Sequence, residues 1–141
     1  MSMLRKDLHN NLAVKNAFHT AAISSSTTTS GVILDLQGYD AVEFLMQMGN
    51  WTDGVYTPSI VEGNAANLSD GVAVSNADNL FGSYAACATA LNADDTVAKL
   101  GYRVGPFRYI RLDIVSSGVT TGTAALSATA ILSNADNMPV A

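Results

Sequence analysis

The chain has 141 residues, of which 48% are hydrophobic and only 13% charged, and its formal net charge is −5. This length suits one domain with a substantial core, and the apolar content excludes a chain that is disordered throughout. The acidic balance argues against nucleic acid as a partner. A surface built largely from small polar residues suits a protein packed in an assembly, or an extracellular β-protein.

The N-terminal residues differ in charge from the rest of the chain. Residues 1–19 contain three bases and one acid, whereas residues 35–95 contain nine acids and no base. Leu4, Leu8 and Leu12 have helical spacing, but asparagines interrupt the stripe, and residues 24–30 are all Ser or Thr. We therefore predict an extended or partly helical arm with a hinge over residues 1–31 and a folded domain over residues 32–141.

The domain is organised around residues 41–48. Val42, Phe44, Met46 and Met48 occupy alternate positions there, which is the period-two pattern of a strand with one buried face. Residues 108–115 show the same pattern, with apolar residues at 110, 112 and 114 on one side. These two segments are the clearest predicted strands.

Further strands are predicted at residues 32–36, 55–62, 96–104 and 123–132, with turn residues between them. Pro58 indicates an edge position or a bulge, because proline cannot donate to a ladder. Residues 81–91 are rich in alanine, but we predict a strand because both neighbours have β patterns. The predicted fold is all-β: an antiparallel β-sandwich or jelly-roll-like body with an extended N-terminal arm.

No catalytic constellation is visible, so we expect no enzymatic activity and no cofactor. His9 and His19 lie in the predicted arm, and Cys87 is the single cysteine, so no metal-ligand spacing occurs. The alanines around Cys87 predict a buried, unreactive thiol. No run approaches the ~20 apolar residues of a membrane helix.

Two binding functions remain as alternatives. Trp51 and Tyr56 could form a stacking platform for a carbohydrate, although an aromatic that caps the fold or lies in an interface explains Trp51 better. Arg103, Arg108 and Arg111 alternate with aromatic residues, as in single-strand nucleic-acid binders. Cross-strand pairing of these arginines with acids such as Asp113 is the favoured explanation.

Short segments along nearly the whole chain resemble small structural proteins of tailed bacteriophages. They are DLHNN (7–11), GYDAVEF (38–44), VEG (61–63), NLSD (67–70), DNLFG (78–82), KLGY (99–102), RYIR (108–111) and AIL (130–132). This resemblance implies a capsid decoration or cement protein that is made in the bacterial host cytoplasm and binds the outside of the major capsid protein shell. It also leaves open a neck or tail role and a homo-oligomer such as a trimer, and it supplies no catalytic residue.

The predicted partner contacts lie in the arm. Its apolar residues have no visible partner within their own segment, so docking elsewhere would bury them at about 25 cal/mol per Å². The bases are placed to meet acids on a partner. The predicted contact residues are Leu4, Arg5, Lys6, Leu8, Leu12, Val14, Lys15 and Phe18.

Overall fold

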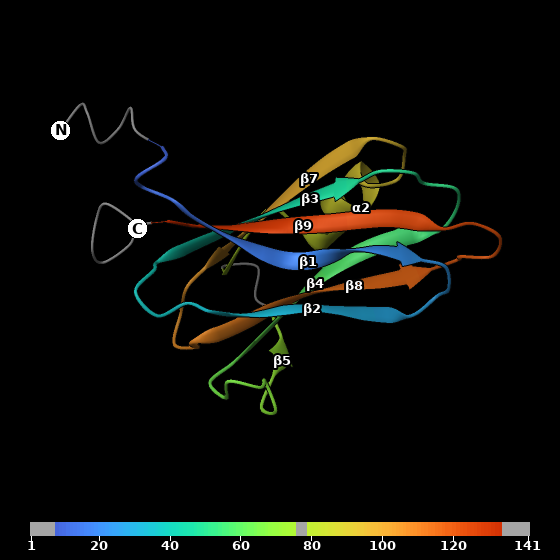
Figure 1. Cartoon of the computed structure of the whole chain (residues 1–141). Coiled ribbons are helices and arrows are strands. Elements are labelled where there is room, and N and C mark those ends of the chain that lie inside the picture. Colours follow the sequence, from blue (N-terminus) through green and yellow to red (C-terminus); the bar gives the residue numbers. More distant parts are fainter. Residues whose placement is uncertain (1–7, 76–78, 134–141) are drawn as a thin grey trace.

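Two antiparallel sheets face each other across a hydrophobic core (Figure 1). The computed structural model describes residues 8–75 and 79–133. Sheet A has the strand order β1-β9-β3-β7-β6, and sheet B has the order β2-β8-β4-β5. The bounds are β1 Ala13–Ile23, β2 Thr28–Asp35, β3 Ala41–Met48, β4 Val55–Gly63, β5 Val72–Ala73, β6 Leu80–Phe81, α2 Tyr84–Ala90, β7 Thr96–Arg103, β8 Tyr109–Ser117 and β9 Ala124–Ser133.

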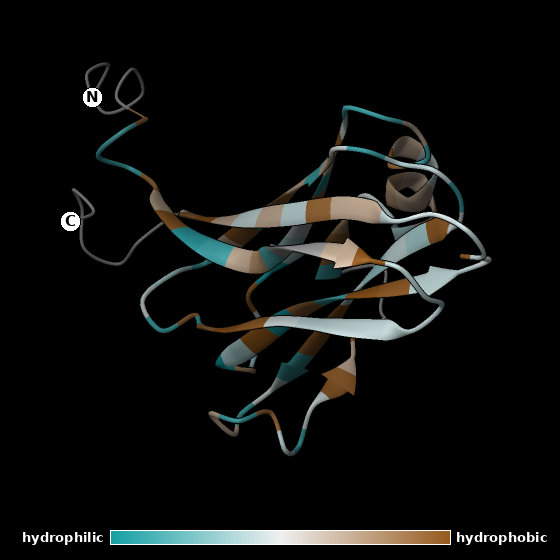
Figure 2. Ribbon diagram, turned by 45° about the vertical axis from the view of Figure 1, so that its right-hand side comes forward, coloured by the Kyte–Doolittle hydropathy of each residue, from teal (hydrophilic) through white to brown (hydrophobic). Residues whose placement is uncertain are grey.

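Consecutive long strands alternate between the sheets, so each connection crosses from one layer to the other. Without the short β6, the orders β1-β9-β3-β7 and β2-β8-β4-β5 are those of an eight-stranded jelly roll. Figure 2 shows hydrophobic and more hydrophilic residues alternating along several of these strands, such as β9, as a two-layer sandwich requires. The predicted all-β sandwich is confirmed.

The core is centred on the two strands with the clearest sequence pattern. In β3 the side chains of Phe44, Met46 and Met48 are fully buried, and β3 lies between β9 and β7. In β8, which belongs to sheet B, Ile110 and Leu112 are equally inaccessible and belong to the same core cluster. Pro58 lies on β4 opposite Ile114 of β8, beyond the two residues of β4 that pair with β5, so the predicted edge position is confirmed.

The N-terminal part of the chain differs from the predicted arm. Residues 13–23 form β1, which pairs with β9, and residues 28–31 belong to β2. The pairing of β1 shifts between Asn16 and Phe18 and again between Phe18 and Ala21. Such bulges break the alternation of apolar and polar residues, which is why the sequence shows no sustained period here. The sandwich therefore begins at Ala13 rather than at residue 32.

The Ser/Thr run is a fixed connection rather than the predicted hinge. The Ser116 hydroxyl donates to the backbone oxygen of Ser25 at 2.7 Å and accepts from the Thr27 amide at 3.0 Å. Gly31 packs so tightly that a Cβ there would collide with the carbonyl oxygens of Ala17 and Leu112. The predicted domain boundary between residues 31 and 32 is therefore wrong, because β1 and β2 are both part of the sandwich.

The alanine-rich segment is also different from its prediction. Residues 84–90 form helix α2, and the Ser83 side chain caps its N-terminus by accepting from the Ala86 amide at 3.1 Å. Alanine's high helix propensity and this cap outweigh the β pattern on either side. Cys87 and Ala88 are buried, and α2 packs against β4 of sheet B and β7 of sheet A.

Candidate interaction surfaces

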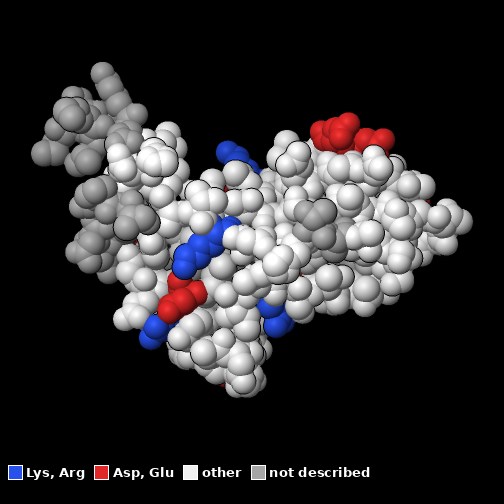
Figure 3. All heavy atoms as spheres, in the orientation of Figure 1, with Lys and Arg blue, Asp and Glu red and all other residues white. Residues whose placement is uncertain are grey.

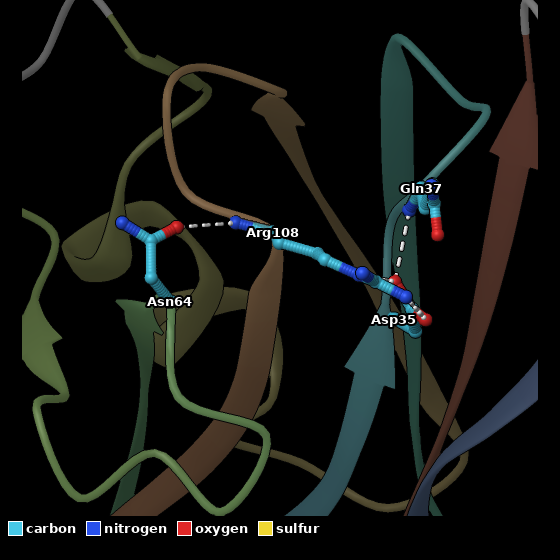
Figure 4. A network of polar contacts seen from close by, with 4 residues as sticks. All are labelled: Asp35, Gln37, Asn64 and Arg108. Carbon is cyan, nitrogen blue, oxygen red and sulfur yellow. Dashed lines mark hydrogen bonds and ion pairs between the residues drawn. The ribbon is translucent and has the colours of Figure 1, made fainter.

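An ion pair joins the end of β2 to the start of β8 in sheet B. Arg108 donates to both carboxylate oxygens of Asp35, with distances of 2.9 Å from Nε and 2.8 Å from Nη2. The Gln37 amide also donates to Asp35, and the Arg108 amide donates to the Asn64 side chain at 3.2 Å (Figure 4). The Arg108 guanidinium holds the pKa of Asp35 down at about 2, against an ordinary value of 3.8.

The other predicted arginines are also engaged. Arg111 donates to Asp113 at 2.6 and 2.9 Å, but the two residues lie on the same strand rather than on neighbouring strands. Arg103 lies over the Phe81 ring at 5.8 Å from its centroid. Figure 3 shows most of one face of the molecule covered by residues without charge, with acids and bases scattered over it. That face carries no basic stripe of the kind that binds nucleic acid.

Trp51 and Tyr56, the two aromatic residues considered for carbohydrate binding, instead form hydrogen bonds to backbone atoms of the 49–54 loop. Trp51 donates from Nε1 to the Gly54 carbonyl at 3.0 Å, and Tyr56 donates to the Asp53 carbonyl at 3.0 Å. Tyr56 is 1% exposed and cannot stack on a sugar. The Asp53 carboxylate accepts from Thr120 and from the Thr121 amide, which lowers its pKa to about 2 and joins the 49–54 loop to the 118–123 loop.

The predicted contact residues fall into three groups. Leu4, Arg5 and Lys6 lie outside the described residues. Leu8 and Val14 are 67% and 66% exposed, Lys15 is exposed and Leu12 is partly exposed, so these four are accessible to a partner. Phe18 is 2% exposed and belongs to the core. Its prediction as a contact is wrong, because β1 turns this side chain inward opposite Ala128.

One apolar surface was not predicted. Two adjoining hollows of about 220 and 310 Å³ share Val97, Ala98 and Lys99 of β7. The first continues to α2, where Ala86 and Ala90 are exposed, and the second continues to Leu45 of β3. We call this surface the α2–β7 groove. One feature of the sequence indicates this surface: Leu45 is an apolar residue at an outward-facing position of β3.

The described part of the chain contains no candidate metal site. Residues 8–75 and 79–133 contain no group of three or more His, Cys, Asp or Glu side chains that could hold a metal ion. Burial raises the pKa of the Cys87 thiol, which donates to the Lys99 carbonyl, and its predicted burial is confirmed. Among the same residues no helix could span a membrane.

The fold defines the chain as a jelly-roll-like β-sandwich, and comparisons with solved structures support this class. No protein-family profile and no curated protein matches the sequence. The VP2 subviral particle of infectious bursal disease virus matches with a TM-score of 0.57 and 13% identity, over 89% of this chain and 33% of that chain. The Gx strain of the same virus matches with a TM-score of 0.54 and 17% identity, over 91% and 34%.

The chain thus spans about a third of the length of these viral chains. The SPBc2 prophage-derived protein YomS matches with a TM-score of 0.48 and 9% identity, over 86% of this chain and 92% of YomS. At these identities the likeness to the viral chains establishes a shared fold.

Proposed function

We propose that this chain is a structural virion protein that decorates and stabilises a bacteriophage capsid from outside the major capsid protein shell. The observation that carries the proposal is the jelly-roll sandwich, which it shares with chains of infectious bursal disease virus and of its VP2 subviral particle. The sequence segments that resemble tailed-phage structural proteins support the same class. The protein acts without a cofactor and without catalysis.

The N-terminal residues attach the body to neighbouring subunits of the shell. Leu8 and Val14 expose two thirds of their side chains at the start of sheet A, where they gain nothing from the core. Apolar area of this kind stabilises an assembly by about 25 cal/mol per Å² when it is covered. Arg5, Lys6 and Lys15 add positive charge beside these residues, so attachment has an electrostatic component that salt screens.

The test is rebinding of the purified protein to particles that lack it. Full-length protein is compared with Leu8→Asp, and with Val72→Asp as a control because Val72 is 63% exposed on β5 of sheet B. We expect Leu8→Asp to weaken attachment at least tenfold and Val72→Asp to leave it unchanged, as measured by co-sedimentation with the particles. Equal attachment of both variants would refute the role of the N-terminal residues.

A neck or tail position is the second candidate for the same sandwich. Copy number in purified particles separates the two positions, since a decoration protein is present in the high copy number of the shell. Mass spectrometry of intact particles would measure it. Absence of the chain from particles would refute both.

A further inference from the structure

The α2–β7 groove is an apolar surface without a cover among the described residues. Val97 is 66% exposed and Leu45 37% exposed, and both project from the outer face of sheet A. Phe81 at the neighbouring edge is 55% exposed. Ala86 and Ala90 of α2 form the opposite wall and carry no side chain long enough to cover the groove. A concave apolar surface of this kind is a candidate docking site for another apolar segment.

A carboxylate beside the groove lacks a partner. Glu43 lies on β3 two residues before Leu45, with its side chain over Gly101. It forms no ion pair or hydrogen bond with any residue in the described ranges, and burial raises its pKa while Lys99 opposes the shift. A partner that brings a base to this point would satisfy the charge. Lys99 and Arg103 border the same region, so a strongly basic partner such as a long lysine run does not fit.

The chain itself contains a segment with the matching chemistry. Residues 1–12 precede the sandwich and include Met1, Met3, Leu4, Leu8 and Leu12 together with two bases and one acid. The remaining residues carry five bases and eleven acids, so segment and body have opposite charge. Twelve extended residues span up to about 40 Å, which is enough to reach a neighbouring molecule.

The described start of this segment leads away from its own groove. Residues 8–12 leave sheet A at its end, beyond the first residues of β1, and extend away from the sandwich (Figure 1). The Asn11 amide donates to the Leu8 carbonyl at 3.1 Å in a turn that keeps Leu8 exposed. Docking onto a neighbour requires no reversal of this path.

We propose that the α2–β7 groove binds residues 1–12 of a second copy of this chain. The apolar side chains of the segment fill the two hollows, and one of its bases meets Glu43. The proposal rests on the proposed function in one respect: the second copy is a neighbour on the same particle, and residues 1–12 dock on it in addition to the shell contact proposed for the N-terminal residues. Because segment and groove lie on different parts of the molecule, the contact is head-to-tail and builds rings or open chains on the particle surface.

The first experiment measures self-association of the full chain by sedimentation equilibrium over a wide concentration range. Val97→Asp places a charge in the groove, and Val72→Asp is the control with nearly the same exposure on β5 of the other sheet. We expect Val97→Asp to weaken self-association at least tenfold and Val72→Asp to change it less than twofold. A full chain that stays monomeric at all concentrations, or equal weakening by both variants, would overturn the proposal.

A mixing experiment then tests the head-to-tail geometry. The Val97→Asp variant has an intact N-terminal segment but a groove that no longer binds. The double variant Arg5→Glu, Lys6→Glu has an intact groove but a segment that binds weakly. We expect each variant alone to be mainly monomeric and an equimolar mixture to form dimers that grow no further. A mixture that remains monomeric would refute exchange between copies and would indicate that the segment docks within its own chain or on the shell protein alone.

Particle binding separates this inference from the proposed function. If Val97→Asp loses self-association but still attaches to particles, groove and shell contact are independent and both proposals stand. If wild-type protein attaches to particles and Val97→Asp self-associates normally, the proposed function stands and the groove assignment fails.

Discussion

The outer faces of the two sheets differ in whether their charged side chains form ion pairs. On sheet B, Arg111 pairs with Asp113 and Arg108 pairs with Asp35. On sheet A, Glu43 and Lys99 form no ion pair within the described ranges, and exposed apolar residues lie beside them. Sheet B also exposes apolar residues, at Val55, Val72 and Val115, so the contrast between the two faces lies in the pairing of their charges. Sheet A differs further in the two hollows of the α2–β7 groove, the surface that we propose as an interface.

The inner faces show no such difference, and the first prediction tests their equivalence. Phe44→Ala in sheet A and Leu112→Ala in sheet B each remove a side chain with no exposed area. We expect each to lower the free energy of unfolding by about 2–5 kcal/mol, from lost transfer energy and the cavity left behind. Urea unfolding measures the change. Leu45→Ala, next to Phe44 but outward, is the control and should cost far less.

The second prediction contrasts the two outward carboxylates. Asp113 is 5% exposed and accepts two hydrogen bonds from Arg111, so Asp113→Asn should cost about 1–3 kcal/mol. Glu43 has no such partner among the described residues, and burial raises its pKa, so folding disfavours its ionised form relative to its protonated form. Glu43→Gln should therefore cause no loss of stability at pH 7. Equal losses for both variants, measured by urea unfolding, would contradict the contrast between the faces.

A strand of this protein can be predicted from the sequence where its alternation of apolar and polar residues is regular. In β3 and β8 the period of two is unbroken, so the buried residues Phe44 and Leu112 were identified correctly. In β1 two register shifts surround Phe18, and a pattern interrupted by bulges cannot be distinguished from an irregular arm. The sequence does not predict helix α2, because the β patterns on both sides of the segment favour a strand over alanine's own helix propensity.

The candidate surfaces were predicted only in part, for a reason that applies beyond this chain. Exposure of Leu8 and Val14 follows from their place before and at the start of the first strand. The α2–β7 groove joins Leu45 to Ala86 and Ala90, which are more than forty residues away in sequence. No local pattern links a strand to a helix across such a distance, because their proximity depends on the strand order of the sheets.

The third prediction uses pH to weaken the charge pairing of sheet B. The pKa of Asp35 falls from 3.8 to about 2 on folding, because Arg108 stabilises its ionised form. A lowered pKa contributes stability above about pH 4, and this contribution is lost as the pH falls towards 2. Asp35→Asn should therefore lose less stability than wild type between pH 7 and pH 2.5. Because both side chains are more than 40% exposed, the difference should stay below about 1 kcal/mol.

The last and smallest effect is expected where sheet A is proposed to be an interface. Val97→Ser removes an apolar side chain that is 66% exposed, and such a side chain contributes little to the core of an isolated chain. Its free energy of unfolding at low protein concentration should stay within about 0.5 kcal/mol of wild type. At high concentration wild type should gain apparent stability that the variant lacks, because association favours the folded state by mass action. Unfolding midpoints measured across a range of protein concentrations would show this divergence. Parallel midpoints would mean that Val97 faces only water, and the contrast between the two faces would then have no role in assembly.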